Sequence, residues 1–200
     1  MPKIKLTKGE LKRQRDGLAQ FRHYLPTLQL KKQQLQVEIS KIIHAKEEMK
    51  AAIDSFWEKL DSWISVFGEE VDIRKYIKAD KISLVSGNIA GIEIPVYEGV
   101  KIKENPCDSY DTPLWMDKGI EAVKNMVDLK AKLLVLEKQS RILNEELRIT
   151  TQRVNLFEKV KIPQTRENIR VIRVFLGDLF TAEVVRGKIA KAKLEKAAQK

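Results

Sequence analysis

The sequence predicts a mainly α-helical fold: a long antiparallel, left-handed coiled-coil hairpin of N- and C-terminal helices, with a small insertion between them that contains a β-hairpin. Three observations predict it. Heptad patterns of apolar residues occupy both ends of the 200-residue chain. The segment between them collects turn-forming and β-branched residues. Charged residues reach 33% and aromatics only 6%, a composition that suits long, thin helices better than a thick globular core.

The first heptad pattern predicts a helix from about residue 8 to residue 67. Of its 17 a and d positions, 14 are apolar. A seven-residue repeat without a stutter implies a left-handed supercoil, and ~1.5 Å per residue gives a length of roughly 90 Å. The a positions are Leu11, Leu18, Leu25, Lys32, Ile39, Lys46, Ile53, Leu60 and Phe67, and the d positions are Gln14, Phe21, Leu28, Leu35, Ile42, Met49, Phe56 and Trp63.

Cap and breaker residues mark the ends of this helix. Thr7 is the predicted N-cap, with Glu10 three residues later as a capping box. Gly68 is the predicted C-terminal stop. Pro26 lies inside the pattern and should kink the helix or weaken its first third, because proline removes a backbone donor.

A second heptad pattern predicts a C-terminal helix from about residue 115 to residue 196, bent near Pro163. The phase of the apolar stripe moves by one residue at this proline, since Ile162 follows Val154 by eight positions. Before the proline the stripe comprises Ala122, Met126, Leu129, Leu133, Leu136, Ser140, Leu143, Leu147, Thr150, Val154 and Phe157. Beyond it the stripe continues as Ile162, Ile169, Ile172, Leu176 and Leu179.

The insertion between the two helices is predicted at residues 68–114. β-branched residues cluster at 82–85 and 91–96, and Ser86-Gly87-Asn88 between them is turn-forming, so a short β-hairpin is expected. Residues 105–112 are expected to form a loop. The predicted organisation is one elongated domain with three parts: the helix 1–67, the insertion 68–114 and the helix 115–200. Because the insertion lies outside both heptad stripes, it is not expected to build the coiled coil.

The net charge of +10 is unevenly distributed. Residues 1–50 and 151–200 each carry a net charge of +7, whereas 51–100 carry −4 and 101–150 carry 0. An antiparallel hairpin places both basic ends at one tip, which is either a docking surface for a partner or a set of solvated helix faces. No basic run is interleaved with aromatics, as base stacking would need. The candidate tip residues are Arg13, Arg15, Arg22, Arg186, Lys188 and Lys191.

Residues with catalytic chemistry are few. His23 and His44 lie in no metal-ligand spacing, and Gly187-Lys188 lacks the rest of a phosphate-binding loop. The single cysteine, Cys107, has no partner and fits a reducing compartment. No apolar core of a signal peptide and no membrane span are found. We therefore predict no catalytic, cofactor-binding or metal-binding residue, and a soluble protein that reaches a membrane only through a partner.

Three sequence blocks carry a family resemblance. They are residues 6–11 with 28–35, residues 88–95 (NIAGIEIP) and residues 153–163 (RVNLFEKVKIP). The three blocks occur in this order on the predicted helical hairpin. With them the chain resembles the D-subunit family of the V-type (archaeal and bacterial A/V-type) rotary ATPases. Gln29, Asn168 and the segment 177–183 depart from the family pattern. The motif positions are Asn88, Gly91, Pro95, Arg153, Val154, Asn155 and Pro163.

The resemblance implies a central-stalk rotor shaft. Such a shaft passes through a hexamer of catalytic A and B subunits, binds the small F subunit of the stalk, and docks on the C/d subunit that caps the membrane ring. It couples ATP hydrolysis or synthesis to proton or sodium transport without a catalytic residue or cofactor of its own. The implied location is cytoplasmic, peripheral to the inner or plasma membrane. The insertion would support the F subunit or regulate coupling. The alternative is a nucleic-acid-binding or chaperone-like scaffold that uses the basic tip directly.

Overall fold

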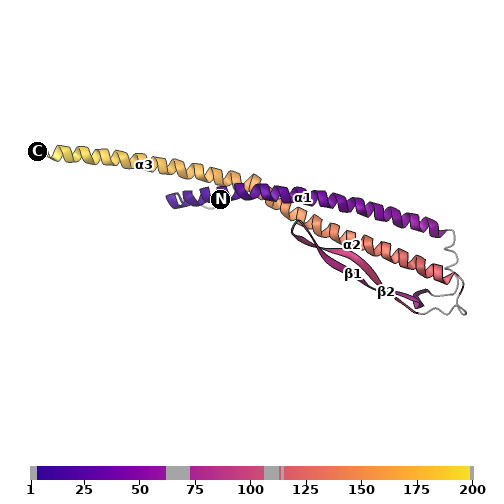
Figure 1. The fold of residues 1–200 in the computed structure, drawn as a ribbon. Coiled ribbons are helices and arrows are strands. Elements are labelled where there is room, and N and C mark those ends of the chain that lie inside the picture. Colours follow the sequence, from indigo (N-terminus) through magenta and orange to yellow (C-terminus); the bar gives the residue numbers. More distant parts are fainter. Residues whose placement is uncertain (1–3, 62–72, 106–112, 114, 199–200) are drawn as a thin grey trace. The chain divides into compact units, whose positions relative to one another are not determined.

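The computed structural model describes residues 4–61, 73–105, 113 and 115–198. Within them the chain is mainly helical, with two long helices packed together and a two-strand antiparallel β-hairpin between them, as predicted (Figure 1). The predicted stop at Gly68 and residues 106–112 of the predicted loop 105–112 lie outside the described residues. The elements are α1 (Lys8–Asp61), a 3₁₀ turn (Ile73–Lys75), β1 (Ile77–Ile89), β2 (Ile92–Glu104), α2 (Met116–Asn155), a π-helical segment (Leu156–Lys161) and α3 (Ile162–Ala198).

The chain divides into two compact units. One comprises Met1–Leu30 and Thr150–Lys200, and the other comprises Lys31–Ile149. We call them the terminal unit and the hairpin unit. Helices α1 and α2 each contribute to both, whereas the β-hairpin belongs to the hairpin unit alone and α3 to the terminal unit alone.

Helix α1 follows its predicted heptad. Its start is confirmed, because the Thr7 hydroxyl oxygen accepts a hydrogen bond of 3.3 Å from the Glu10 backbone N–H. Every described a and d position is buried or partly buried. The helix continues through Pro26 without a break. The fully buried members of the stripe are Leu35, Ile39, Ile42, Ile53 and Leu60.

The core of the hairpin unit lies between α1 and α2. Leu35 and Leu143 are completely enclosed, each with 0% of its surface exposed. They form one cluster with Ile39, Ile42 and Ile94. A second cluster contains Ile53, Leu60, Ala122 and Met126. The heptads of the two helices therefore meet as predicted, and apolar burial at these seams is the main stabilising term.

The β-hairpin is longer than predicted, and its turn lies elsewhere. Ser86-Gly87-Asn88 is the turn that the sequence predicts, but these residues lie inside β1, and Ala90-Gly91 make the turn between the paired Ile89 and Ile92. Both turn residues have positive φ, 52° and 78°, as a tight type I′-like turn requires. The Asn88 side chain accepts a hydrogen bond of 3.0 Å from the Gly91 N–H. Asn88 therefore stabilises the turn from the strand that precedes it.

Replacing Ala90 by glycine is expected to stabilise the hairpin unit by up to about 1 kcal/mol. An alanine at φ 52° pays a steric cost that glycine avoids, although glycine also adds freedom to the unfolded chain. Gly87→Ala is the opposite case, because a Cβ there would lie 2.7 Å from the Val96 Cγ2. Thermal unfolding of both variants checks this: a lower melting temperature for Ala90→Gly would contradict the strained turn.

The hairpin packs against α2, and one of its residues enters the coiled-coil core although the insertion lies outside both heptad stripes. Ile94, only 4% exposed, reaches the coiled-coil core. The buried Gln139 side chain donates a hydrogen bond of 2.6 Å to the Pro95 carbonyl oxygen. Farther along, Lys124 pairs with Glu104 at 2.7 Å. Helix α2 therefore has two buried faces, one toward α1 and one toward β2.

In the terminal unit, the predicted phase change appears as a π-helical turn. The Ile162 N–H bonds to the carbonyl of Phe157, five residues back, so the segment accommodates one extra residue before Pro163. Across the unit Phe21 contacts Phe157, with ring centroids 5.2 Å apart. Ile162, Ile169 and Ile172 are buried as expected. Leu176 is partly buried and Leu179 is 44% exposed, so the last buried residue of the stripe is Ile172.

Candidate functional site

The family-motif residues of the hairpin unit have structural roles. Asn88 and Gly91 close the turn, and Pro95 accepts the hydrogen bond from Gln139. In the terminal unit, Val154 is buried, whereas Arg153 and Asn155 are exposed at the end of α2. Pro163 follows the π-helical segment at the start of α3. The motifs thus mark where the chain turns, docks or changes its helical phase.

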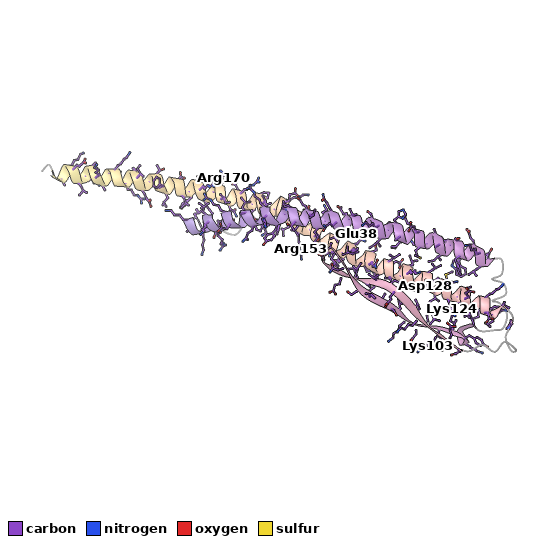
Figure 2. All side chains as sticks on the ribbon, in the orientation of Figure 1. Glu38, Lys103, Lys124, Asp128, Arg153 and Arg170 are labelled. Carbon is purple, nitrogen blue, oxygen red and sulfur yellow. The ribbon has the colours of Figure 1, made fainter. Side chains whose placement is uncertain are left out.

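A polar cluster holds β2 on α2. The Tyr97 hydroxyl donates a hydrogen bond to Asp128, and Lys132 pairs with the same carboxylate at 2.7 Å. Figure 2 labels Asp128 on α2. Burial and the bond to Asp128 raise the pKa of Tyr97 to about 12. Partial burial by itself would raise the pKa of Asp128, but the hydrogen bonds from Lys132 and Tyr97 outweigh it and lower this pKa.

Asp128→Asn is expected to lower the pKa of Tyr97 part of the way back to its ordinary value of 10.0, because the neighbouring negative charge is lost while burial remains. Since folding raises this pKa, the contribution of Tyr97 to stability is present below pH 10 and is lost as the pH rises through about 12. Ultraviolet titration of the phenolates measures the shift, with Tyr97→Phe identifying the signal and Asp80→Asn as control. Identical titrations of wild type and Asp128→Asn would contradict the contact.

The candidate basic residues are all exposed and all belong to the terminal unit, but they do not form one patch. Ile4, at the start of the described chain, lines the same groove as Pro163. Residues 177–197 lie farther along α3 and are all exposed. The expectation that the two basic ends lie side by side is therefore wrong: Arg13, Arg15 and Arg22 lie beside the first turns of α3, and Arg186, Lys188 and Lys191 extend past them.

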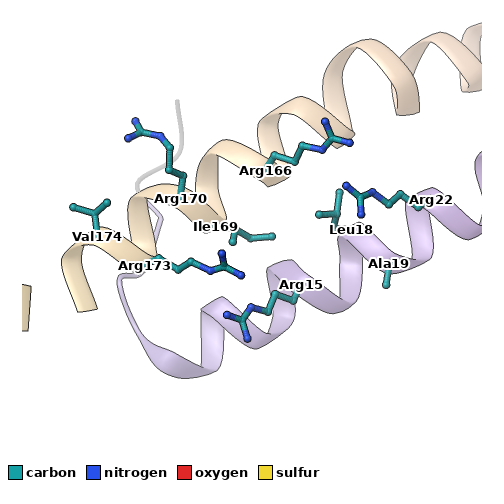
Figure 3. A pocket seen from close by; sticks show the side chains of 9 residues that line it. All are labelled: Arg15, Leu18, Ala19, Arg22, Arg166, Ile169, Arg170, Arg173 and Val174. Atoms are coloured by element: carbon teal, nitrogen blue, oxygen red, sulfur yellow. The ribbon is translucent and has the colours of Figure 1, made fainter. Parts of the chain in front are cut away.

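Arginines from α1 and α3 gather at one groove of about 610 Å³, which we call the arginine groove. Leu18 and Ile169 lie between them (Figure 3). Sequence reasoning identifies only the two arginines of α1, because membership of the groove depends on the alignment of the two helices. The five arginines that line it are Arg15, Arg22, Arg166, Arg170 and Arg173.

The second half of α3 exposes large apolar side chains. Phe180 and Leu194 are 67% and 71% exposed. Among the described residues, no buried hydrophobic core residue lies beyond Ile172. The other exposed apolar residues of this segment are Leu179, Val184, Val185 and Ile189. So many exposed large apolar side chains on one helical segment are typical of a helix that packs against another protein.

The described residues provide little for catalysis or metal binding. They contain no group of three or more His, Cys, Asp or Glu side chains that is able to hold a metal ion. His44 is exposed and lies 3.2 Å from the Glu48 carboxylate on the same helix. Cys107 lies outside the described residues. None of the described helices is long and apolar enough to cross a membrane.

Comparison with known proteins gives the family. A family model for the D subunit of ATP synthase matches residues 10–192. The V-type ATP synthase D subunit of Borreliella burgdorferi is 46% identical over 196 residues, covering 98% of this chain and 97% of the relative. The corresponding protein of Chlamydia felis is 37% identical over 199 residues, covering 96% and 94%. This chain therefore belongs to the D-subunit family of the V-type ATP synthases and is a component of a V-type ATPase complex.

Proposed function

We propose that this chain is the central-stalk rotor shaft of its complex. It rotates inside the hexamer of A and B subunits and couples ATP hydrolysis or synthesis there to ion transport through the membrane ring. In this role it contributes no catalytic residue. The shaft presents different surfaces to chemically equivalent sites and so biases each toward a different conformation, which is how rotation and chemistry become coupled.

The observation that carries this proposal is the exposed second half of α3. Six large apolar side chains lie there among the basic residues Arg186, Lys188 and Lys191. Solvent alone is a poor environment for so much apolar surface on a helix, and fully burying one such side chain contributes roughly 1.5–3 kcal/mol. A hexamer that surrounds this segment would bury it, while the basic residues guide its orientation.

The remaining partners follow from the same proposal. The small F subunit of the stalk binds the hairpin unit, which exposes apolar side chains on β1 such as Leu84 and Val85. The ring-capping C/d subunit binds a part of the shaft that lies outside the hexamer. The chain then lies on the cytoplasmic side and associates with the membrane only through the complex.

Replacing Phe180 and Val184 by serine tests the role of α3. Both side chains are exposed one turn apart, so the isolated chain should keep its melting temperature within about 2 °C. Assembly with the purified A and B subunits should weaken at least tenfold, since ~1.4 kcal/mol of lost burial is a factor of ten. Glu183→Gln, between them, is the control for altered surface polarity.

Quantitative pull-down with the A and B subunits gives the assembly constants. Wild-type assembly by the Phe180→Ser, Val184→Ser variant would show that this surface is not the docking segment. Failure of the wild-type chain to assemble with these subunits at all would overturn the proposed function itself.

A further inference from the structure

We propose that the arginine groove binds an acidic protein segment that presents two carboxylates about 10 Å apart with an apolar side chain between them. The inference rests on the proposed function and deepens it, because the segment would belong to another subunit of the complex. Three properties of the groove support it: unpaired charge, regular spacing and an apolar floor.

The first property is unpaired positive charge. Arg170 is satisfied within the chain, since its guanidinium bonds to Glu167 at 2.6 Å and this hydrogen bond lowers the pKa of that carboxyl. The other four arginines make no hydrogen bond or ion pair with any described residue. They are Arg15, Arg22, Arg166 and Arg173. Four guanidinium groups without a counter-charge around one groove make it a favourable place for an anion.

The second property is regular spacing. Each helix contributes two of these arginines seven residues apart, which is two helical turns or about 10 Å. Figure 3 shows Arg15 and Arg173 extending toward each other from the two helices, and Arg22 and Arg166 extending into the groove near its other end. The groove therefore offers two guanidinium groups from each helix at a spacing of two turns, and guanidinium groups bind carboxylates through charge-assisted hydrogen bonds.

The third property is the floor between these arginines. Ile169 is buried and Leu18 is partly buried, so an apolar side chain has a surface to pack on there. None of the side chains that line the arginine groove is aromatic, so stacked nucleic-acid bases find no platform. A protein segment supplies carboxylates and an apolar side chain together. On a helix the two acidic residues would be seven positions apart.

The direct test uses the full-length chain and a helical peptide with Glu at positions 1 and 8 and Leu at position 4. We expect binding that weakens with salt and falls at least tenfold when Arg15, Arg22, Arg166 and Arg173 are all changed to Gln. The matched control removes four exposed charges elsewhere in the same unit, at Lys8, Lys12, Lys159 and Lys161, and should change affinity less than threefold. Peptides with the second Glu moved to position 6 should bind more weakly.

The same variants report on the complex and on folding. The four-arginine variant should weaken assembly with the A and B subunits more than the control does, and its isolated melting temperature should stay equal or rise because like charges are removed. Equal effects of the two charge-removal variants, or a melting temperature several degrees lower for the groove variant, would overturn the proposal. Tighter arginine-dependent binding of tripolyphosphate or duplex DNA than of the peptide would also overturn it.

These outcomes separate the two proposals. Peptide binding by the isolated chain does not depend on the proposed function. Normal assembly by the groove variant would leave the rotor proposal intact and remove the acidic-segment proposal. A chain that binds the peptide but does not assemble with the A and B subunits would remove the rotor proposal alone.

Discussion

Leu35→Asp is expected to reduce the free energy of unfolding by roughly 4 kcal/mol or more, enough to unfold the hairpin unit at moderate temperature. The Leu35 side chain of α1 is completely enclosed. It belongs to one cluster with Ile39 of the same helix, Leu143 of α2 and Ile94 of β2. A carboxylate at this position loses its water and gains no counter-charge, while the apolar contacts of leucine are lost as well. Chemical denaturation followed by circular dichroism measures the change.

Gln33→Glu is the matched control, two residues away on the same helix. Gln33 is exposed, so the added charge stays in water and should change stability by about 0.5 kcal/mol or less. Similar unfolding midpoints for the two variants would mean that the heptad seam does not lie where the structure places it.

Ile94→Asp is expected to be the next most damaging change, at about 3 kcal/mol. Ile94 is the residue of β2 that enters the coiled-coil core, and Gln139 bonds to the carbonyl of its neighbour Pro95. Charge at Ile94 should therefore release the hairpin from α2 and open the core beside Leu143. Amide hydrogen exchange should show protection lost in β1, in β2 and in the facing part of α2.

Val85→Asp provides the comparison within the same hairpin. Val85 is 50% exposed, so its replacement should cost less than about 1 kcal/mol and leave exchange in α2 unchanged. If amide exchange in α2 is the same in Ile94→Asp as in the wild-type chain, the hairpin does not support α2 and this account of the core is wrong.

Sequence reasoning finds the elements that depend on local periodicity. The seven-residue repeat of α1 is enough to identify Leu35, Ile39 and Ile42 as core positions, because a long coiled coil repeats one environment many times. The eight-residue step from Val154 to Ile162 likewise identifies the phase change, which the structure realises as a π-helical turn.

The errors arise where tertiary contacts override local signals. Ser86-Gly87-Asn88 has turn-forming composition, but Gly87 is needed because Val96 passes close to it, and Asn88 acts on the turn from a distance. The second buried face of α2, with Ala131, Val135 and Gln139 at successive turns, lies outside the heptad stripe that identifies the helix. The partner of Gln139 is a backbone carbonyl of β2, which no pattern in α2 reveals.

The candidate site can be predicted from the sequence only in part, because its residues are brought together by tertiary contacts. Charge counting finds the basic ends, and Arg15 and Arg22 among them, but it assumes that the two ends meet. The alignment of α1 with α3 instead joins these residues to Arg166 and Arg173, far from the C-terminal basic residues. Which charges share a groove is a property of how helices are aligned, and single-chain periodicity does not determine that alignment.

Rotation of a label on this chain within the assembled complex tests the central claim most directly. Cys107→Ser removes the only cysteine of this chain, and Lys81→Cys on the exposed surface of β1 allows the chain to be labelled at one site before assembly. With the catalytic hexamer immobilised and ATP supplied, we expect the attached probe to rotate in one direction and to stop when ATP is withdrawn. The isolated chain should hydrolyse no ATP. A probe that stays fixed while the complex hydrolyses ATP would contradict the assignment of this chain as the rotor shaft.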